Sequence, residues 1–330
     1  MTSAMFTADV TYTQYWETLF RQPVTVWQPI LDAIRTRHAL PTGAWHRFAL
    51  GRNAVFRLDE AYVVKVIPPF WQRDAQREAA ALSWVHERLP VTTPTLLAAG
   101  EWNGWHYLVE PYLSGQVLRD VWPQLTEAQR VDLATQHGTI MAALHNLPIK
   151  QAPGALDFDW QAMISEQLAV CATEMGKANV PALLLADLDA YLAAQQAAVL
   201  EHTPTVLLHG DLNFLNLLVD MQQGHWQITA LIDWSDAKVG PIAHEWISPG
   251  VHMYRGDRAP LHALYAAYAQ DHALARTAAF EAQIMARAMI YYADTFRYQL
   301  SVVPGALDCT CWTEVAQRFW HLNQAETTLP

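Results

Sequence analysis

Three polar residues in the second half of the chain, Asp211, Asn216 and Asp233, have the types and the spacing that phosphoryl transfer needs. Asp211 and Asn216 lie in a polar loop after a short apolar run, and residues 215–232 read as a hairpin that returns Asp233 to that loop. A carboxylate can accept the proton of a hydroxyl group, and carboxylate and amide oxygens suit Mg²⁺. The sequence therefore predicts a catalytic base and two metal ligands here.

The motifs around these residues resemble those of the aminoglycoside phosphotransferase and choline kinase family, the small-molecule branch of the protein-kinase-like fold. The family's His-Gly-Asp-x-x-x-x-Asn loop and Ile-Asp-[Trp/Phe] motif read here as His209-Gly210-Asp211 with Asn216, and as Ile232-Asp233-Trp234. The resemblance implies that Asp211 is the catalytic base and that Asn216 and Asp233 bind Mg²⁺. It also implies that His209 shapes the loop.

The first part of the chain supplies residues that could hold ATP. Lys65 lies in a strand-like run and can pair with the α- and β-phosphates, and Glu78, thirteen residues later on a predicted helix, can hold that lysine. The segment Gly51-Arg52-Asn53 lies where the family's phosphate-covering loop is found, and we expect backbone amides near Arg52 and Asn53 to cover the phosphates.

Residues 108–112 resemble the linker that binds adenine in kinase-like folds. In this register the carbonyl of Glu110 and the N–H of Tyr112 would contact the base. Pro111, which has no N–H, falls between them, where no donor is needed.

Further along, Gly240 and Glu245 partly match the family's Gly-Asp-Pro-x-x-Asp segment, whose acid supports the catalytic loop. The acceptor would bind on the helical part, facing Asp211. We expect Asp236, Asp257 and Asp294 on the acceptor side.

The elements that must position these residues fall into two groups. The first group begins with helices over 12–39, divided near Pro23. A sheet and one helix over 71–89 follow, and the predicted strands of this sheet are 44–50, 54–58, 62–66, 95–98 and 105–109. The second is mainly helical, over 126–147, 159–175, 182–201, 261–300 and 313–323. We therefore predict an α+β, two-lobed protein-kinase-like fold, with a nucleotide-binding lobe over 1–112 and a helical lobe over 113–330.

Composition narrows the class of partner. The 330 residues carry a net charge of −11, which argues against binding a nucleic-acid polymer, and the hydrophobic fraction of 52% argues against disorder. Residues 1–115 hold equal numbers of basic and acidic side chains, so the whole acidic excess lies in 116–330. That distribution favours a cationic acceptor through electrostatic attraction.

The low number of cysteines, three, and the absence of a signal-like start indicate a cytoplasmic protein. The most apolar stretch, 181–200, is interrupted by Asp187 and Asp189, so we expect no membrane partner. The predicted function is an ATP- and Mg²⁺-dependent phosphotransferase that acts on a hydroxyl group of a small molecule such as an aminoglycoside. Alternatives are a kinase of choline, homoserine, a macrolide or a sugar, and a nucleotide-binding protein without catalysis. A protein kinase is disfavoured by Gly210 and by the absence of Ala-Pro-Glu after Asp233.

Overall fold

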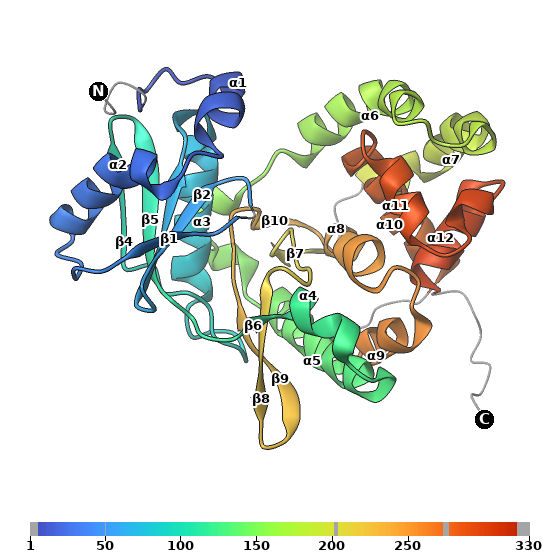
Figure 1. Ribbon diagram of the computed structural model, residues 1–330. Coiled ribbons are helices and arrows are strands. Elements are labelled where there is room, and N and C mark those ends of the chain that lie inside the picture. Colours follow the sequence, from blue (N-terminus) through green and yellow to red (C-terminus); the bar gives the residue numbers. More distant parts are fainter. Residues whose placement is uncertain (1–5, 50, 201–203, 273–276, 322–330) are drawn as a thin grey trace.

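The protein has two lobes joined by a short linker, and the computed structural model describes residues 6–49, 51–200, 204–272 and 277–321 (Figure 1). The smaller lobe contains one antiparallel sheet with the strand order β1-β2-β3-β5-β4. Its strands are β1 (Trp45–Arg47), β2 (Ala54–Leu58), β3 (Tyr62–Ile67), β4 (Ala98–Trp102) and β5 (Trp105–Pro111). Together with the helices of the larger lobe, this sheet confirms the predicted two-lobed α+β fold.

The strand register places the two charged residues Lys65 and Glu110 on one face of the sheet. Lys65 pairs with Leu108 and Val63 pairs with Glu110, so Lys65 and Glu110 point to the same side. Helix α3 (Gln72–Val85) covers this side and brings Glu78 to Lys65. The sheet and α3 therefore position the predicted nucleotide-binding residues.

The other face of the sheet packs on the N-terminal helices. The chain forms α1 (Tyr12–Gln14), a π-helical segment η2 (Tyr15–Leu19) and α2 (Val24–Arg37), and Pro23 stands at the N-cap of α2. The predicted division near Pro23 is thus confirmed. Phe6, Trp27 and Trp105 pack edge-on or tilted against one another at the centre of this core.

The larger lobe combines helices with two small sheets. β7 pairs with β10, and β8 pairs with both β6 and β9. The stretch predicted as helix over 261–300 is divided among three helices. The elements are β6 (Gln116–Val117), α4 (Leu118–Val121), α5 (Glu127–His145), α6 (Trp160–Lys177), α7 (Ala182–Leu200), β7 (Thr205–Leu208), β8 (Leu217–Gln222), β9 (His225–Leu231), β10 (Lys238–Pro241), α8 (Ile242–Glu245), α9 (Arg258–Tyr268), α10 (Ala278–Tyr291), α11 (Phe296–Val302) and α12 (Trp312–Trp320).

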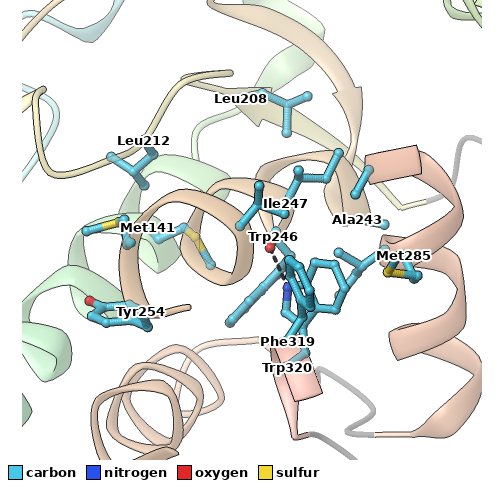
Figure 2. Packing of buried hydrophobic residues seen from close by; sticks show 14 of the residues in the cluster. Met141, Leu208, Leu212, Ala243, Trp246, Ile247, Tyr254, Met285, Phe319 and Trp320 are labelled. Atoms are coloured by element: carbon cyan, nitrogen blue, oxygen red, sulfur yellow. Dashed lines mark hydrogen bonds between the residues drawn. The ribbon is translucent and has the colours of Figure 1, made fainter. Parts of the chain in front are cut away.

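The core of this lobe anchors the loop that carries Asp211. Leu208 and Leu212, on either side of that loop, belong to the buried cluster shown in Figure 2. Beneath them, the indole N–H of Trp320 on α12 donates to the carbonyl of Trp246, 2.9 Å away. Buried apolar side chains flanking the loop hold its ends, so the polar residues between them have fixed positions.

Helix α7 is the one described helix that is long and apolar enough to cross a membrane by length and composition. Its Leu184 and Leu188 are buried in the helical lobe, and the backbone N–H of Trp312 donates to Asp187 Oδ2, 2.9 Å away. These contacts show that α7 packs within this lobe. Asp187, the acidic residue that interrupts its apolar sequence, accepts a hydrogen bond from the first residue of α12.

Backbone hydrogen bonds of Thr92 also join the two lobes. Its N–H donates to the carbonyl of Thr229 at 3.1 Å, and its carbonyl accepts from the N–H of Leu231 at 2.9 Å. Thr92 lies between α3 and β4, and Leu231 ends β9. This bridge joins the smaller lobe to the strand that leads into Asp233.

A buried histidine in α5 predicts how stability depends on pH. Burial lowers the pKa of His137 to about 3, and its Nδ1 lies 3.0 Å from the hydroxyl of Tyr254. In the unfolded chain His137 becomes protonated as the pH falls below about 6.5, whereas in the folded chain it stays neutral until about pH 3. The contribution of His137 to stability is therefore fully present above pH 6.5 and falls progressively toward pH 3. His137→Gln should reduce the slope of unfolding free energy against pH by about 1.4 kcal/mol per pH unit between pH 4 and 6.

Urea unfolding at pH 4.5, 5.5 and 6.5 measures this slope. Ile140→Val on the same helix removes buried apolar volume without a titrating group, so it should lower stability equally at each pH. An unchanged slope in His137→Gln would contradict the assignment.

Candidate active site

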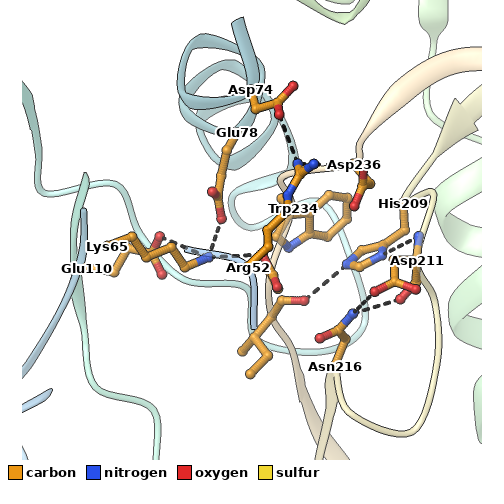
Figure 3. Close-up of polar contacts among 12 residues, drawn as sticks. Arg52, Lys65, Asp74, Glu78, Glu110, His209, Asp211, Asn216, Trp234 and Asp236 are labelled. Carbon is orange, nitrogen blue, oxygen red and sulfur yellow. Dashed lines mark hydrogen bonds and ion pairs between the residues drawn. The ribbon is translucent and has the colours of Figure 1, made fainter. Parts of the chain in front are cut away.

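The loop between β7 and β8 holds Asp211 in a fixed network (Figure 3). The amide nitrogen of Asn216 donates to the Asp211 carbonyl at 2.7 Å and to its Oδ2 at 3.0 Å. The amide nitrogen of Asn213 donates to Asp211 Oδ1 at 2.6 Å, and its amide oxygen accepts from the N–H of Leu215. Asn213 was missed by the sequence analysis, although it lies inside the motif. The two amides therefore orient the carboxylate of Asp211.

The surroundings of Asp211 favour a group that can accept a proton. Burial, followed by the charges of Asp236 and Asp233, raises the pKa of Asp211 to about 7, against the lowering effect of the two amides. A general base works best when its pKa is close to the working pH, so Asp211 has the basicity that this role needs.

His209 and Glu245 hold the backbone of the loop. His209 Nδ1 accepts from the N–H of Asp211, so its Nε2 carries the proton and donates to the carbonyl of Ile232, 3.1 Å away. The two oxygens of Glu245 accept from the N–H groups of His209 and Gly210, at 2.6 and 3.1 Å. The chain therefore places Glu245, with its longer side chain, where the family's shorter Asp would support the loop.

Gly210 could not be another residue in this arrangement. Its φ is +82°, and a Cβ atom would lie 2.3 Å from the backbone carbonyl oxygen of Asp236. The close approach of these two backbones brings Asp236 next to Asp211.

Replacing Glu245 by Gln tests the support of the loop. Glu245 is 1% exposed, and Gln has only one amide oxygen, so one of the two backbone N–H groups would face an NH₂ group. We expect the free energy of unfolding to fall by about 2–3 kcal/mol. Urea unfolding measures this, with exposed Glu166→Gln on α6 as the control. Wild-type stability in Glu245→Gln would show that the carboxylate does not hold the loop.

Lys65 lies at the centre of three carboxylates. Its Nζ contacts Glu78, and lies 3.3 Å from Asp233 Oδ1 and 3.7 Å from Glu110 Oε1. Burial would lower the pKa of Lys65, but the charges of Glu110, Glu78 and Asp233 raise it well above its ordinary value. The predicted pairing of Lys65 with Glu78 is present, and its ammonium group is charged.

The donor set fits Mg²⁺. Asp233 has a left-handed φ of +62°, and 43% of its side chain is exposed. Asn216 uses its amide nitrogen on Asp211, which leaves its amide oxygen to bind a cation. The described residues contain no group of three or more His, Cys, Asp or Glu that could hold a metal. Mg²⁺ commonly takes its remaining ligands from phosphates and water, so two protein oxygens are sufficient.

The predicted phosphate-covering loop lies over the same cleft. The carbonyl of Arg52 accepts from the hydroxyl of Tyr15 at 2.7 Å, and Asn53 is buried at the start of β2. The guanidinium of Arg52 points across the cleft toward Asp236 of the larger lobe (Figure 3). The loop therefore brings the side chain of Arg52 to the site, and the phosphate contacts of its backbone amides stay a prediction.

The predicted base contact of Tyr112 is wrong. Its N–H donates to the carbonyl of Ala61 at 2.9 Å, because β5 continues to Pro111 in register with β3 and the pairing extends one residue further. Glu110 lies inside the strand, opposite Val63, and its side chain is directed to Lys65. The adenine contact predicted for the Glu110 carbonyl would likewise place the base against a paired strand, so the register predicted for the base-binding linker does not fit this pairing.

The comparison with protein families agrees with this geometry. The model of the phosphotransferase enzyme family, APH, matches residues 45–280, which span every residue of the network around Lys65 and Asp211. The chain belongs to the phosphotransferase enzyme family.

Solved structures confirm the fold of this phosphotransferase. The GDP and kanamycin complex of APH(2")-IIIa has a TM-score of 0.64 at 17% identity, covering 89% of this chain and 97% of that chain. The streptomycin–ATP–APH(2")-IIa ternary complex has a TM-score of 0.61 at 16% identity, covering 88% and 97%. The macrolide 2'-phosphotransferase MphH from Brachybacterium faecium has a TM-score of 0.56 at 20% identity, covering 88% and 97%.

Only one of the three predicted acceptor-side acids of this phosphotransferase lies beside Asp211. The backbone of Asp236 lies against Gly210, in the loop that carries Asp211. Asp257 is exposed at the N-cap of α9, and Asp294 is exposed in the turn after α10. No contact in the described part of the chain joins either of them to Asp211. Next to Asp236, β10 contributes Lys238, which is buried and lies 5.0 Å from the ring centre of Phe158.

Proposed function

We propose that the chain is an ATP- and Mg²⁺-dependent phosphotransferase that moves the γ-phosphate to a hydroxyl group of a small molecule. Asp211 orients the acceptor hydroxyl and takes its proton. Asn216 and Asp233 hold Mg²⁺, which would neutralise phosphate charge when bound. Lys65, held by Glu78, positions the nucleotide.

The observation that carries this proposal is the convergence of both lobes on Asp233. Lys65 of the smaller lobe lies 3.3 Å from Asp233, although 168 residues separate them. The backbone N–H of Ile232, next to Asp233, donates to the carbonyl of Asn216 at 2.9 Å. Contacts thus connect the proposed phosphate-binding cation, the two proposed metal ligands and the proposed base, which supports a mechanism of positioning and charge neutralisation.

In this proposal, residues 1–112 bind the nucleotide, and residues 113–330 hold the catalytic loop and the acceptor. Backbone amides of Arg52 and Asn53 cover the phosphates, while His209 and Glu245 shape the catalytic loop. We expect the partners to be a nucleotide and a small hydroxyl-bearing acceptor. We expect neither a nucleic-acid polymer nor a membrane as a partner, and we expect a cytoplasmic location.

We further propose a cationic acceptor. The acidic excess of residues 116–330 favours one, and Asp236 is the acid whose charge acts most strongly on Asp211. Asp257 and Asp294 stay at the outer surface in this arrangement, so any effect they have on the acceptor would act through long-range charge.

A coupled assay of ADP release tests the function. We expect Mg²⁺-dependent turnover with at least one acceptor from a panel of kanamycin, streptomycin, a macrolide, choline, homoserine and a sugar, and loss of turnover with EDTA. A best acceptor that is neutral or anionic would contradict the cationic proposal but leave the phosphotransferase proposal standing. Titration calorimetry that detects no Mg²⁺-dependent binding of ATP would instead favour a protein without catalysis.

A further inference from the structure

The side chain of Arg52 reaches from one lobe to the other across the cleft. Its Nη2 lies 3.0 Å from Oδ2 of Asp74 on α3 and 3.9 Å from Oδ1 of Asp236 on the larger lobe. Its guanidinium carbon lies 5.0 Å from the ring centre of Trp71. Figure 3 shows this guanidinium above the space between Lys65 and Asp211. Asp74 and Trp71 therefore hold a second cation over the proposed path of the phosphoryl group.

The guanidinium of Arg52 has more N–H donors than its ion pair with Asp74 can occupy. Nη2 of Arg52 is buried, and no contact among the described residues gives it hydrogen-bond geometry, although Asp74 lies within ion-pair distance. The separation of 3.9 Å from Asp236 is also too long for a hydrogen bond. A guanidinium carries five N–H donors, so Arg52 can keep its ion pair with Asp74 and still donate to a second anion.

We propose that Arg52 is a catalytic residue whose guanidinium binds the nonbridging oxygens of the transferring phosphoryl group. The planar guanidinium matches phosphate oxygens in pairs, and Asp74 and Trp71 keep it oriented. The inference rests on the proposed function, since it assigns a further residue to the same reaction.

The reaction assigns a separate task to each group. The bond between the acceptor oxygen and the γ-phosphorus forms as the bond from that phosphorus to the β,γ-bridging oxygen breaks. The hydroxyl proton passes to Asp211, and the electron pair of the broken bond stays on the β-phosphate of ADP. Arg52 stabilises the charge on the nonbridging oxygens while the group is between donor and acceptor.

Arg52→Gln and Arg52→Lys test the proposal by comparing two equilibrium affinities. MgADP alone measures ground-state binding, and MgADP with aluminium fluoride measures binding of a mimic of the transferring phosphoryl group. In Arg52→Gln we expect the affinity for the mimic to fall by about 10²-fold or more, and kcat to fall similarly. The affinity for MgADP should change less than about threefold, and Arg52→Lys should recover part of the loss.

The matched control is Arg88→Gln. Arg88 is exposed and stacks on Trp84, with its guanidinium carbon 3.8 Å from the ring centre, but it lies outside the cleft network. We expect wild-type affinities and kcat from this variant.

The proposal is overturned if Arg52→Gln lowers both affinities by the same factor, or if its kcat stays within threefold of the wild type. Equal losses would show that Arg52 only holds the lobes together. A wild-type protein that neither binds Mg²⁺-nucleotide nor turns over would instead refute the proposed function itself.

Discussion

Asp211→Asn is expected to lower kcat by about 10²–10⁴-fold, because the acceptor hydroxyl loses the group that takes its proton. The substitution also disturbs orientation, since Asn has one oxygen to accept the two hydrogen bonds that Asn213 and Asn216 now donate. KM for ATP should change little, because Asp211 contacts neither Lys65 nor Asp233 in this structure. Steady-state ADP release with the best acceptor measures both constants.

The control for Asp211→Asn is Asp220→Asn, which changes an exposed carboxylate on β8. It should leave both constants at wild-type values. If Asp211→Asn kept a wild-type kcat, then Asp211 would not be the base, whatever other residue took the proton.

Lys65→Met is expected to damage both stability and nucleotide binding. Glu78 and Glu110 are 0% and 3% exposed, and Lys65 is the cation that faces both of them. Burial raises the pKa of Glu78 to about 8 and also raises that of Glu110. Removing one partner of a buried ion pair typically costs about 3–5 kcal/mol, so we expect the loss to approach that range as the pH reaches 8, where Glu78 becomes ionised, and to be smaller at lower pH.

The sign of the pH dependence follows from these raised pKa values. Folded-state pKa values above the unfolded ones mean that stability is retained at low pH and lost as pH rises from about 4.5 toward 8. Without the ammonium group to offset their charge, the deficit of Lys65→Met should therefore be larger at pH 8 than at pH 6. Urea unfolding at both pH values measures it.

A double variant separates the two effects of Lys65→Met. Adding Glu78→Gln removes one of the uncompensated acids, so it should recover stability without restoring ATP binding. Recovery of both would show that Lys65 does not contact the nucleotide, and recovery of neither would place the instability outside this cluster.

Local motifs predicted the site best where one segment carries several of its residues. Asp211 and Asn216 lie in one loop, and their five-residue spacing is enough to place them together. The pairing of Lys65 with Glu78 was predictable for a similar reason, because a strand and the helix that follows it can pack in few ways. Their catalytic roles remain predictions until the variants are measured.

Pairing between distant strands was harder to predict. The register of β5 against β3 decides that the N–H of Tyr112 is already used, and nothing in residues 108–112 encodes where the pairing ends. The edge strand β4 was placed too early, over 95–98, because Leu96 and Leu97 resemble a strand more than Gly100 and Glu101 do. Strand propensity reflects packing against neighbours, which a single sequence does not show.

No sequence motif near Arg52 or Asp236 predicted the contact that they make between the lobes. Arg52 and Asp236 are far apart in the sequence, and neither lies in a motif that requires the other. The side chain of Glu110 was likewise overlooked, since only its carbonyl was considered. In both cases the three-dimensional packing of the lobes determines the partner of a charged residue.

The bridge at Thr92 has a mechanical consequence for the cleft. Two backbone hydrogen bonds join it to β9, and Asp233 is only two residues beyond Leu231. The smaller lobe is therefore bonded directly to the strand that carries the chain to Asp233, so the linker is not the only covalent or hydrogen-bonded link that sets where Lys65 meets Asp233.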